Sequence, residues 1–360
     1  MTPQSIQLDM MKEFMELNQK AMQGMVTLGN LSEEDIAVGT APKEVVYQEN
    51  KMTLYHIKPV VEKPFEIPVL ISYALVNRPN VADLQENRSL IRNLVNLGLD
   101  VYLIDWGYPS RADRWLTMDD YINDYIDTCV DVIRERHNLD KINILGICQG
   151  GTFSLCYTAL HQEKVKNLVL TVTPVDFAVG DSLINRWGHA VGDSKMDVDQ
   201  LIEAFGNIPG DFMNLGFVYL RPFELNLRKY FNMSDMFGDE KKLANFLRME
   251  NWIFDSPDLA GEAYRQFMTD FYLGNKLVKG EVELDGQRVD LSEIKIPVLN
   301  VYAEYDTIVP PASTKALEEY IGTDDYTVQS YPVGHIGMYV SSKVQKTMPS
   351  AVVDWYKNRA

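Results

Sequence analysis

Cysteine is scarce in this sequence, and its scarcity excludes one common way of stabilising a fold. The three cysteines, Cys129, Cys148 and Cys156, are too few and too clustered for a framework of disulfide bonds. They also lack the paired spacing of a metal site, so we expect no metal. Free cysteines are typical of a reducing compartment, and we predict a cytoplasmic protein.

Basic residues are in the minority. The chain has 34 Lys and Arg against 51 Asp and Glu, a net charge of −17 at pH 7. Such a balance excludes a general nucleic-acid binder, because phosphate contacts need basic surface. An anionic substrate, such as a coenzyme A ester, would need a local basic site. The candidates are Arg78, Arg88, Arg92, Arg111 and Arg114, although most of these are expected to be ordinary surface residues.

Long hydrophobic runs are absent as well. The longest apolar stretch, near residues 68–76, falls well below the roughly 20 residues of a membrane span, so we expect no transmembrane segment. The opening residues, MTPQSIQLDMMKEF, lack a basic start followed by an apolar block. We therefore expect no secretory signal.

Apolar strand-like segments alternate with helical segments over much of the chain. Residues 45–59 alternate like a hairpin, and buried strands are predicted at 68–76, 99–106, 141–147, 165–174, 294–306 and 326–332. Helices are predicted at 83–97, 119–138, 150–161, 311–321 and 340–358. This order predicts an α/β fold with a parallel sheet and helices on both faces.

The alternation also divides the chain into segments. It stops near residue 175 and resumes near residue 290, so residues 175–290 are predicted to form a mostly helical cap over a core of residues 41–174 and 291–360. Alternatively, these residues form a second domain that merely decorates the fold. Residues 1–40 form an N-terminal helical segment. Its Met-rich helix either packs on its own domain or presents an adaptable surface to a partner or an apolar product.

The motif Gly146-Ile147-Cys148-Gln149-Gly150 follows one of the predicted strands and opens a helix. It matches the G-x-S-x-G turn of serine hydrolases, with cysteine in place of serine. Glycines at such a turn allow the apex residue a strained backbone that projects its side chain. The helix N-terminus and a nearby imidazole would both favour the thiolate of Cys148. A buried, inert cysteine is the alternative, and it is how we interpret Cys129 and Cys156.

Two further residues complete a catalytic triad. Asp306 follows the predicted strand 294–306, and His335 follows the last strand in a Gly-flanked loop. The order Cys148, Asp306, His335 is the nucleophile–acid–base order of α/β-hydrolases. We expect His335 to accept the thiol proton and Asp306 to orient the imidazole. The backbone N–H groups of Gln149 and Val76 are predicted to form the oxyanion hole.

A thiol nucleophile suits thioester substrates. Attack on a thioester exchanges one thioester for another, so the acyl group stays activated for an alcohol or for water. The pattern favours acyl transfer from a coenzyme A thioester. A cysteine-dependent thioesterase or esterase of the same fold remains an alternative, and so does a non-catalytic scaffold protein that has kept the fold.

Long motifs of this chain resemble the catalytic subunits of polyhydroxyalkanoate synthases, of the short, two-component class III type. The resemblance covers nearly the whole chain and includes YALVNRP (73–79), VYLIDWGYP (101–109), LGICQGG (145–151), VTPVDF (172–177), FLRMENWIFDSPDLAGEAYRQF (246–267) and GHIG (334–337). Class IV synthases are also short and are the nearest alternative.

The resemblance implies a polymerase of (R)-3-hydroxyacyl groups, with short-chain coenzyme A thioesters as substrates and no other cofactor. It implies that Cys148 carries the growing chain, that His335 activates the thiol, and that Asp306 activates the 3-hydroxyl of the incoming unit. It further implies a second, different subunit (PhaE-type), a homodimer of the catalytic subunit, and association with cytoplasmic polymer granules. The residues alone leave both roles of Asp306 open.

Overall fold

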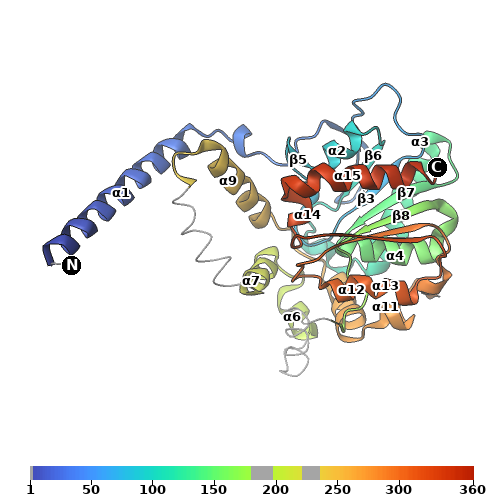
Figure 1. Cartoon of the computed structure of the whole chain (residues 1–360). Coiled ribbons are helices and arrows are strands. Elements are labelled where there is room, and N and C mark those ends of the chain that lie inside the picture. Colours follow the sequence, from blue (N-terminus) through green and yellow to red (C-terminus); the bar gives the residue numbers. More distant parts are fainter. Residues whose placement is uncertain (1–2, 180–197, 221–235) are drawn as a thin grey trace. The chain divides into compact units, whose positions relative to one another are not determined.

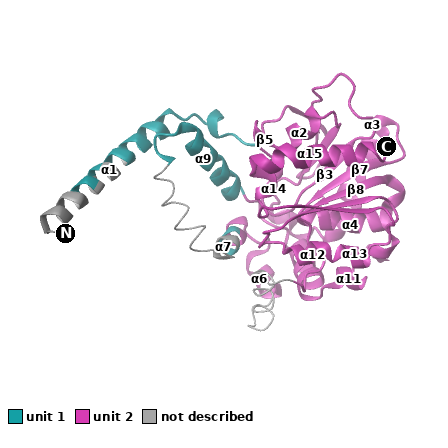
Figure 2. Cartoon of the chain, viewed as in Figure 1, with its two compact units in different colours: residues 1–38, 214–255 teal, residues 39–213, 256–360 magenta. Residues whose placement is uncertain are grey.

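The computed structural model describes residues 3–179, 198–220 and 236–360. These residues fall into two compact units, coloured separately in Figure 2. Unit 1 contains residues 1–38 and 214–255, and unit 2 contains residues 39–213 and 256–360. The predicted cap contributes to both units, and its residues 180–197 and 221–235 lie outside the described part. The boundaries of the cap and its action as a lid therefore stay predictions.

Unit 2 is built on an eight-stranded sheet of order β1-β2-β6-β3-β7-β8-β11-β12. The strands are β1 (Lys43–Glu49), β2 (Met52–Ile57), β3 (Val69–Ser72), β6 (Val101–Asp105), β7 (Ile142–Ile147), β8 (Val165–Thr171), β11 (Val298–Ala303) and β12 (Tyr326–Tyr331). All neighbours from β6 to β12 are parallel, whereas β1–β2 and β2–β6 are antiparallel. The predicted strands and the mainly parallel sheet are confirmed.

Helices cover both faces of the sheet (Figure 1). One face packs on α4 (Gln149–His161), α3 (Asp127–His137) and the π-helical turn η4 (Asp120–Ile126), where Leu70, Tyr102 and Ile144 share one core cluster with those helices. The other face carries α2 (Leu90–Asn96) and α15 (Ser342–Lys357), which pack against each other. Side chains of successive strand residues point to opposite faces, and both faces are covered, so the central strands β3 and β7 are buried along their whole length and mainly apolar.

Shorter elements complete unit 2. They are α6 (Val198–Phe205), α10 (Gly261–Gln266), η8 (Phe267–Leu273), α11 (Lys276–Lys279), α12 (Pro311–Lys315), α13 (Leu317–Tyr320), α14 (Gly337–Val340) and the turns η2 (Pro79–Ala82), η3 (Arg111–Trp115), η5 (Gln162–Lys164) and η9 (Leu291–Glu293). Two hairpins pair β4 (Asp83–Gln85) with β5 (Arg88–Ser89) and β9 (Glu283–Leu284) with β10 (Gln287–Arg288). The predicted helix 311–321 is divided into α12 and α13.

The predicted helix 83–97 is wrong in its first half. Residues 83–89 form the β4–β5 hairpin, and α2 begins only at Leu90. Ser89 explains the late start, because its hydroxyl accepts the N–H of Arg92 (2.9 Å) and caps the helix. The Asp83 carboxylate ties the hairpin to the segment before β1, because it accepts the backbone N–H of Ala41 (2.5 Å).

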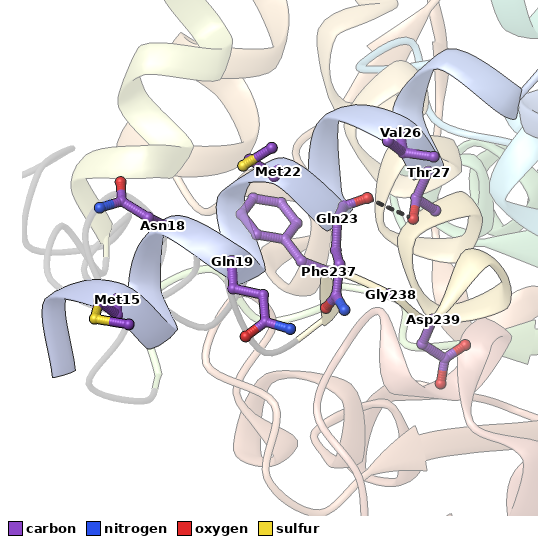
Figure 3. Close-up of a pocket in the computed structure, with 10 residues that line it drawn as sticks. All are labelled: Met15, Asn18, Gln19, Met22, Gln23, Val26, Thr27, Phe237, Gly238 and Asp239. Carbon is purple, nitrogen blue, oxygen red and sulfur yellow. Dashed lines mark hydrogen bonds between the residues drawn. The ribbon is translucent and has the colours of Figure 1, made fainter. Parts of the chain in front are cut away.

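Unit 1 is helical in its described residues. It contains α1 (Pro3–Asn30), η1 (Glu34–Ile36), most of α7 (Gly210–Leu220) and α9 (Glu240–Phe254). A groove of about 1080 Å³ lies between one side of α1, from Met15 to Thr27, and residues 237–239 (Figure 3). The ring of Phe237 packs against Gly24, where a Cβ atom would be 2.6 Å from the ring. The predicted N-terminal helix is present, and its Met22 side chain is 68% exposed.

The crossing of α4 over β3 depends on one glycine. A Cβ atom at Gly150 would lie 2.6 Å from the backbone carbonyl carbons of both Ser72 and Tyr73, closer than real Cβ atoms approach. Only a residue without a side chain lets α4 begin this close to the neighbouring strand.

We expect Gly150→Ala to lower the free energy of unfolding by about 1–3 kcal/mol, because backbone atoms of β3 must move to admit the methyl group. Gly334→Ala is the control in the same unit, since its Cβ would meet only the Tyr305 carbonyl oxygen at an ordinary 3.5 Å. Urea denaturation followed by circular dichroism measures both. Equal stability of the two variants would contradict the packing argument.

Candidate active site

Cys148 stands between β7 and α4 with a strained backbone. Its φ of 55° and ψ of −126° lie outside the ordinary regions for a non-glycine residue. The Cys148 N–H donates to the Thr171 carbonyl of β8 (2.9 Å), and the Cys148 carbonyl accepts the N–H of Gly151 (2.9 Å). This conformation turns the chain sharply from β7 into α4, at a cost of about 1–3 kcal/mol in backbone strain. The predicted sharp turn at the motif is therefore present.

A second strained residue lies beside this turn. Val172, directly after β8, has a φ of 46°, which is a rare value for a β-branched side chain. Its N–H donates to the Val301 carbonyl of β11 (2.8 Å), and its neighbour Thr171 accepts the N–H of Cys148. Strained backbone thus gathers where β7, β8 and β11 end, at the carboxyl edge of the sheet.

Asp306 and His335 meet at the same edge. His335 Nδ1 lies 2.7 Å from Asp306 Oδ2, and both side chains are almost fully buried. The other carboxylate oxygen, Oδ1, accepts the backbone N–H groups of Ile308 and Val309, each at 2.9 Å. Both oxygens of Asp306 are therefore occupied by groups that fix the carboxylate and, through it, the imidazole.

The surroundings of His335 favour its protonated form. Burial by itself lowers the pKa of His335, but the charges of Asp306 and Cys148 and hydrogen bonds to both side chains outweigh it and raise the pKa to about 10. Because Nδ1 faces Asp306, the other ring nitrogen, Nε2, is the one left for Cys148. The structure thus brings the three predicted residues together at the carboxyl edge of the sheet, with Asp306 hydrogen-bonded to His335 and Cys148 close enough to affect its pKa.

Three tyrosines, two of them buried, lie close enough to Cys148 for its charge to affect them. Burial, together with the charge of Cys148, raises the pKa values of Tyr73, Tyr272 and Tyr339 far above the ordinary value. These phenols therefore stay neutral and keep the site apolar. The Tyr339 hydroxyl also bonds to the Thr171 hydroxyl (2.9 Å), next to the strained turn.

The other two cysteines differ sharply from Cys148. Cys148 is partly accessible, whereas Cys129 and Cys156 are fully buried. Burial raises the pKa of Cys156 to about 12 and raises that of Cys129 still further. Thiols of this kind are poor nucleophiles.

The predicted oxyanion donors lie on two neighbouring segments. Gln149 is the first residue of α4, so its N–H has no acceptor within the helix. Val76 lies four residues beyond the end of β3, and the N–H of its neighbour Leu75 is bonded to the side-chain oxygen Oε1 of Gln149 (3.0 Å). This side-chain contact is not predictable from the sequence, because no local pattern signals a bond across 74 residues.

The described residues contain neither a metal-binding cluster nor a membrane-spanning helix. No group of three or more His, Cys, Asp or Glu side chains in residues 3–179, 198–220 and 236–360 has an arrangement that would hold a metal ion. Within the same ranges no helix has both the length and the apolar character needed to cross a membrane.

Known proteins similar to this chain agree on its fold. Residues 68–341 match the family model described as alpha/beta hydrolase fold. Two solved structures share the fold at 15% identity and a TM-score of 0.50. The first is the monoacylglycerol lipase of Paleococcus ferrophilus, with 87% of this chain and 100% of that chain covered. The second is a carboxylesterase structure from Nitrososphaera gargenis, with 88% and 98% covered.

Curated relatives are far more similar in sequence. The poly(3-hydroxyalkanoate) polymerase subunit PhaC of Synechocystis is 57% identical over 96% of this chain and 92% of its own length. The protein of the same name from Allochromatium vinosum is 51% identical over 97% of both chains. A third, from Haloarcula marismortui, is 45% identical over 91% of this chain and 70% of its own length.

Near-complete coverage at such identity confirms both the resemblance and the fold predicted from the sequence. This chain belongs to the PhaC family of poly(3-hydroxyalkanoate) polymerase subunits and has the α/β-hydrolase fold with a mostly helical insertion.

Proposed function

We propose that this chain is an acyltransferase that polymerises (R)-3-hydroxyacyl groups from short-chain coenzyme A thioesters, such as 3-hydroxybutyryl-coenzyme A. Coenzyme A is released, and the acyl chain is carried as a thioester on Cys148. The observation that carries the proposal is the identity of 57% to a polymerase subunit over 96% of the chain. The thioester is the substrate, and the proposal needs no other cofactor.

The arrangement of Cys148, His335 and the two backbone N–H groups supports the first step of the proposed reaction, transfer of the acyl group to Cys148. The Cys148 thiolate attacks the carbonyl carbon of the thioester, and the carbonyl oxygen becomes an oxyanion that the N–H groups of Gln149 and Val76 are proposed to stabilise. The intermediate then collapses, the coenzyme A thiolate leaves, and the His335 imidazolium supplies its proton. His335 is suited to this role because its raised pKa keeps it protonated beside the thiolate.

Chain growth reverses the direction of proton transfer. The 3-hydroxyl of the next unit attacks the thioester on Cys148, an ester bond forms, and the Cys148 thiolate leaves. Neutral His335, which has given up its proton, accepts the hydroxyl proton. The carboxylate of Asp306 has both oxygens engaged, by His335 and by the N–H groups of Ile308 and Val309, which supports an orienting role over direct contact with the hydroxyl.

We also propose that the chain works with a second, different synthase subunit (PhaE-type), as a homodimer of the catalytic subunit, on cytoplasmic polymer granules. Support comes from the family resemblance to two-component synthases. The exposed methionines of α1, Met11, Met15, Met22 and Met25, are each more than 60% exposed and offer an adaptable apolar surface for such contacts.

The main test follows coenzyme A release from (R)-3-hydroxybutyryl-coenzyme A with turbidity in parallel, with and without a PhaE-type subunit. We expect both signals from the unchanged chain, a marked rise with the second subunit, and loss of both in Cys148→Ala. Cys156→Ala, which removes a buried thiol, is the matched control. Release without turbidity would identify a thioesterase, and release that survives Cys148→Ala would contradict the covalent mechanism.

Asp306→Asn tests the orienting role of the carboxylate. The amide keeps the size of the side chain but loses the charge that holds His335 protonated, so we expect kcat to fall by about 10²- to 10⁴-fold. KM for the thioester should change little, because Asp306 does not contact the substrate. A large rise in KM with unchanged kcat would indicate that Asp306 binds substrate instead.

The raised pKa of His335 also predicts a pH dependence of stability. A group whose pKa rises from 6.5 to about 10 on folding stabilises the folded state fully below pH 6.5, and this stabilisation is lost as the pH approaches 10. The difference in free energy of unfolding between the unchanged chain and Asp306→Asn should therefore shrink from pH 6.5 to pH 10.

Asp325→Asn is the control for that measurement. Asp325 pairs with Arg359 (2.7 Å), which does not titrate in this range, so its stability difference should stay constant with pH. Urea denaturation at pH 6, 8 and 10 measures all three proteins. If the difference in free energy of unfolding between the unchanged chain and Asp306→Asn stayed constant with pH, it would contradict an ion pair between Asp306 and protonated His335.

A further inference from the structure

Residues 75–78, here called the oxyanion loop, are attached to their surroundings by side chains on three sides. Gln149 Oε1 accepts the N–H of Leu75 at 3.0 Å, and this bond is buried. Asn77 Nδ2 donates to the hydroxyl oxygen of Ser256 at 2.6 Å. Arg78 forms an ion pair with the buried carboxylate of Asp105. The loop is thus fixed on both sides of Val76, whose N–H is one proposed oxyanion donor.

The bond from Gln149 has a specific consequence for the donors. Because the Leu75 N–H is already paired with Gln149 Oε1, it is not the group that meets an oxyanion. The same residue, Gln149, offers its own unpaired backbone N–H at the start of α4. The Gln149 side chain therefore ties the oxyanion loop, which carries the Val76 donor, to the residue whose own N–H is the other donor.

Asn77 contributes through its backbone as well as its side chain. Its φ is 62°, in the left-handed region that asparagine enters more readily than most residues. This conformation turns the chain directly after Val76, and the bond to Ser256 holds the turn in place. Gly210 packs against the Ser256 carbonyl, where a Cβ would leave only 2.7 Å to the carbonyl carbon, so Ser256 itself lies in a tightly packed segment.

We propose that Gln149 and Asn77 are positioning residues, whose side chains hold the oxyanion loop at the distance from Cys148 that stabilises the oxyanion during acyl transfer. The proposal rests on the proposed function, since an oxyanion hole matters only for attack at a carbonyl. Preorganised donors act through their position, and removal of one donor lowers kcat by about 10²- to 10³-fold in other enzymes. Displacement of a donor should have a smaller effect of the same kind.

Gln149→Met removes the acceptor and keeps the length and volume of the side chain. We expect kcat for coenzyme A release to fall about 10- to 100-fold with little change in KM, because the lost interaction acts in the transition state. Gln266→Met is the matched control. Gln266 Oε1 also accepts a distant backbone N–H, that of Met118 (2.7 Å), but at a place far from the oxyanion loop in the chain.

Alkylation of Cys148 by iodoacetamide separates positioning from general damage to the site. The thiolate displaces iodide from a saturated carbon, so no oxyanion forms, and the rate reports only the state of Cys148 and His335. Cys129 and Cys156 are buried, with raised pKa values, and should not compete. We expect Gln149→Met to be alkylated at the same rate as the unchanged chain.

Asn77→Gly and Ser256→Ala test the second attachment of the loop, the bond between Asn77 and Ser256. They also test the proposal if Gln149→Met does not fold. Glycine keeps the left-handed backbone of residue 77 but removes the donor, and alanine removes the acceptor without changing the loop. We expect each to lower kcat about 3- to 30-fold without slowing alkylation. The effects of the two changes should be less than additive in the double variant, because both remove the same bond between Asn77 and Ser256.

Three results would overturn the proposal. Coenzyme A release by Gln149→Met, Asn77→Gly and Ser256→Ala at the rate of Gln266→Met would show that these side chains do not position the donors. Slower alkylation, in step with slower release, would show a general structural role. An unchanged chain that alkylates readily but releases no coenzyme A would contradict the proposed function itself and the inference with it.

Discussion

The backbone of Cys148 takes a strained conformation with a positive φ, and the elements around it hold this conformation in place. The turn stands between a central strand, β7, and the helix α4, and hydrogen bonds to Thr171 and Gly151 hold it there. Gly150 lets α4 start against the end of β3 without a side chain in the way. A backbone strain of about 1–3 kcal/mol at Cys148 is tolerated because β7 and α4, on either side, hold the turn in place. The turn places the thiol of Cys148, the proposed nucleophile, at the carboxyl edge of the sheet and at the start of α4.

The second feature that shapes the site is the charge of Asp306 beside His335. The chain is strongly acidic overall, and the buried carboxylate of Asp306 faces the imidazole of His335. Two backbone N–H groups stabilise this carboxylate, so its charge remains available to hold His335 protonated and oriented. The tyrosines near Cys148 stay neutral, because burial raises their pKa values, so they add no charge to the site.

The elements that the sequence predicted are those with a local or periodic signal. The apolar strands and the order Cys148, Asp306, His335 can be recognised from short motifs. The sheet then brings the three residues to one edge. The hairpin predicted over residues 45–59 is present as the antiparallel pair β1 and β2, but no local signal indicated that β2 also pairs antiparallel with β6. The predicted helix 83–97 failed because its capping residue, Ser89, lies inside an otherwise helical pattern. The bond from Gln149 to Leu75 joins two distant segments, and only the folded chain reveals it.

The most direct test of the covalent account is the mass of the peptide that contains Cys148 after brief reaction with (R)-3-hydroxybutyryl-coenzyme A. Acid quenching preserves the thioester, and mass spectrometry of the digest reads the added units. The account predicts a ladder on this peptide, spaced by the mass of one 3-hydroxybutyryl unit and lengthening with time. A single unit that never extends, or acyl groups attached elsewhere with Cys148 unmodified, would contradict it.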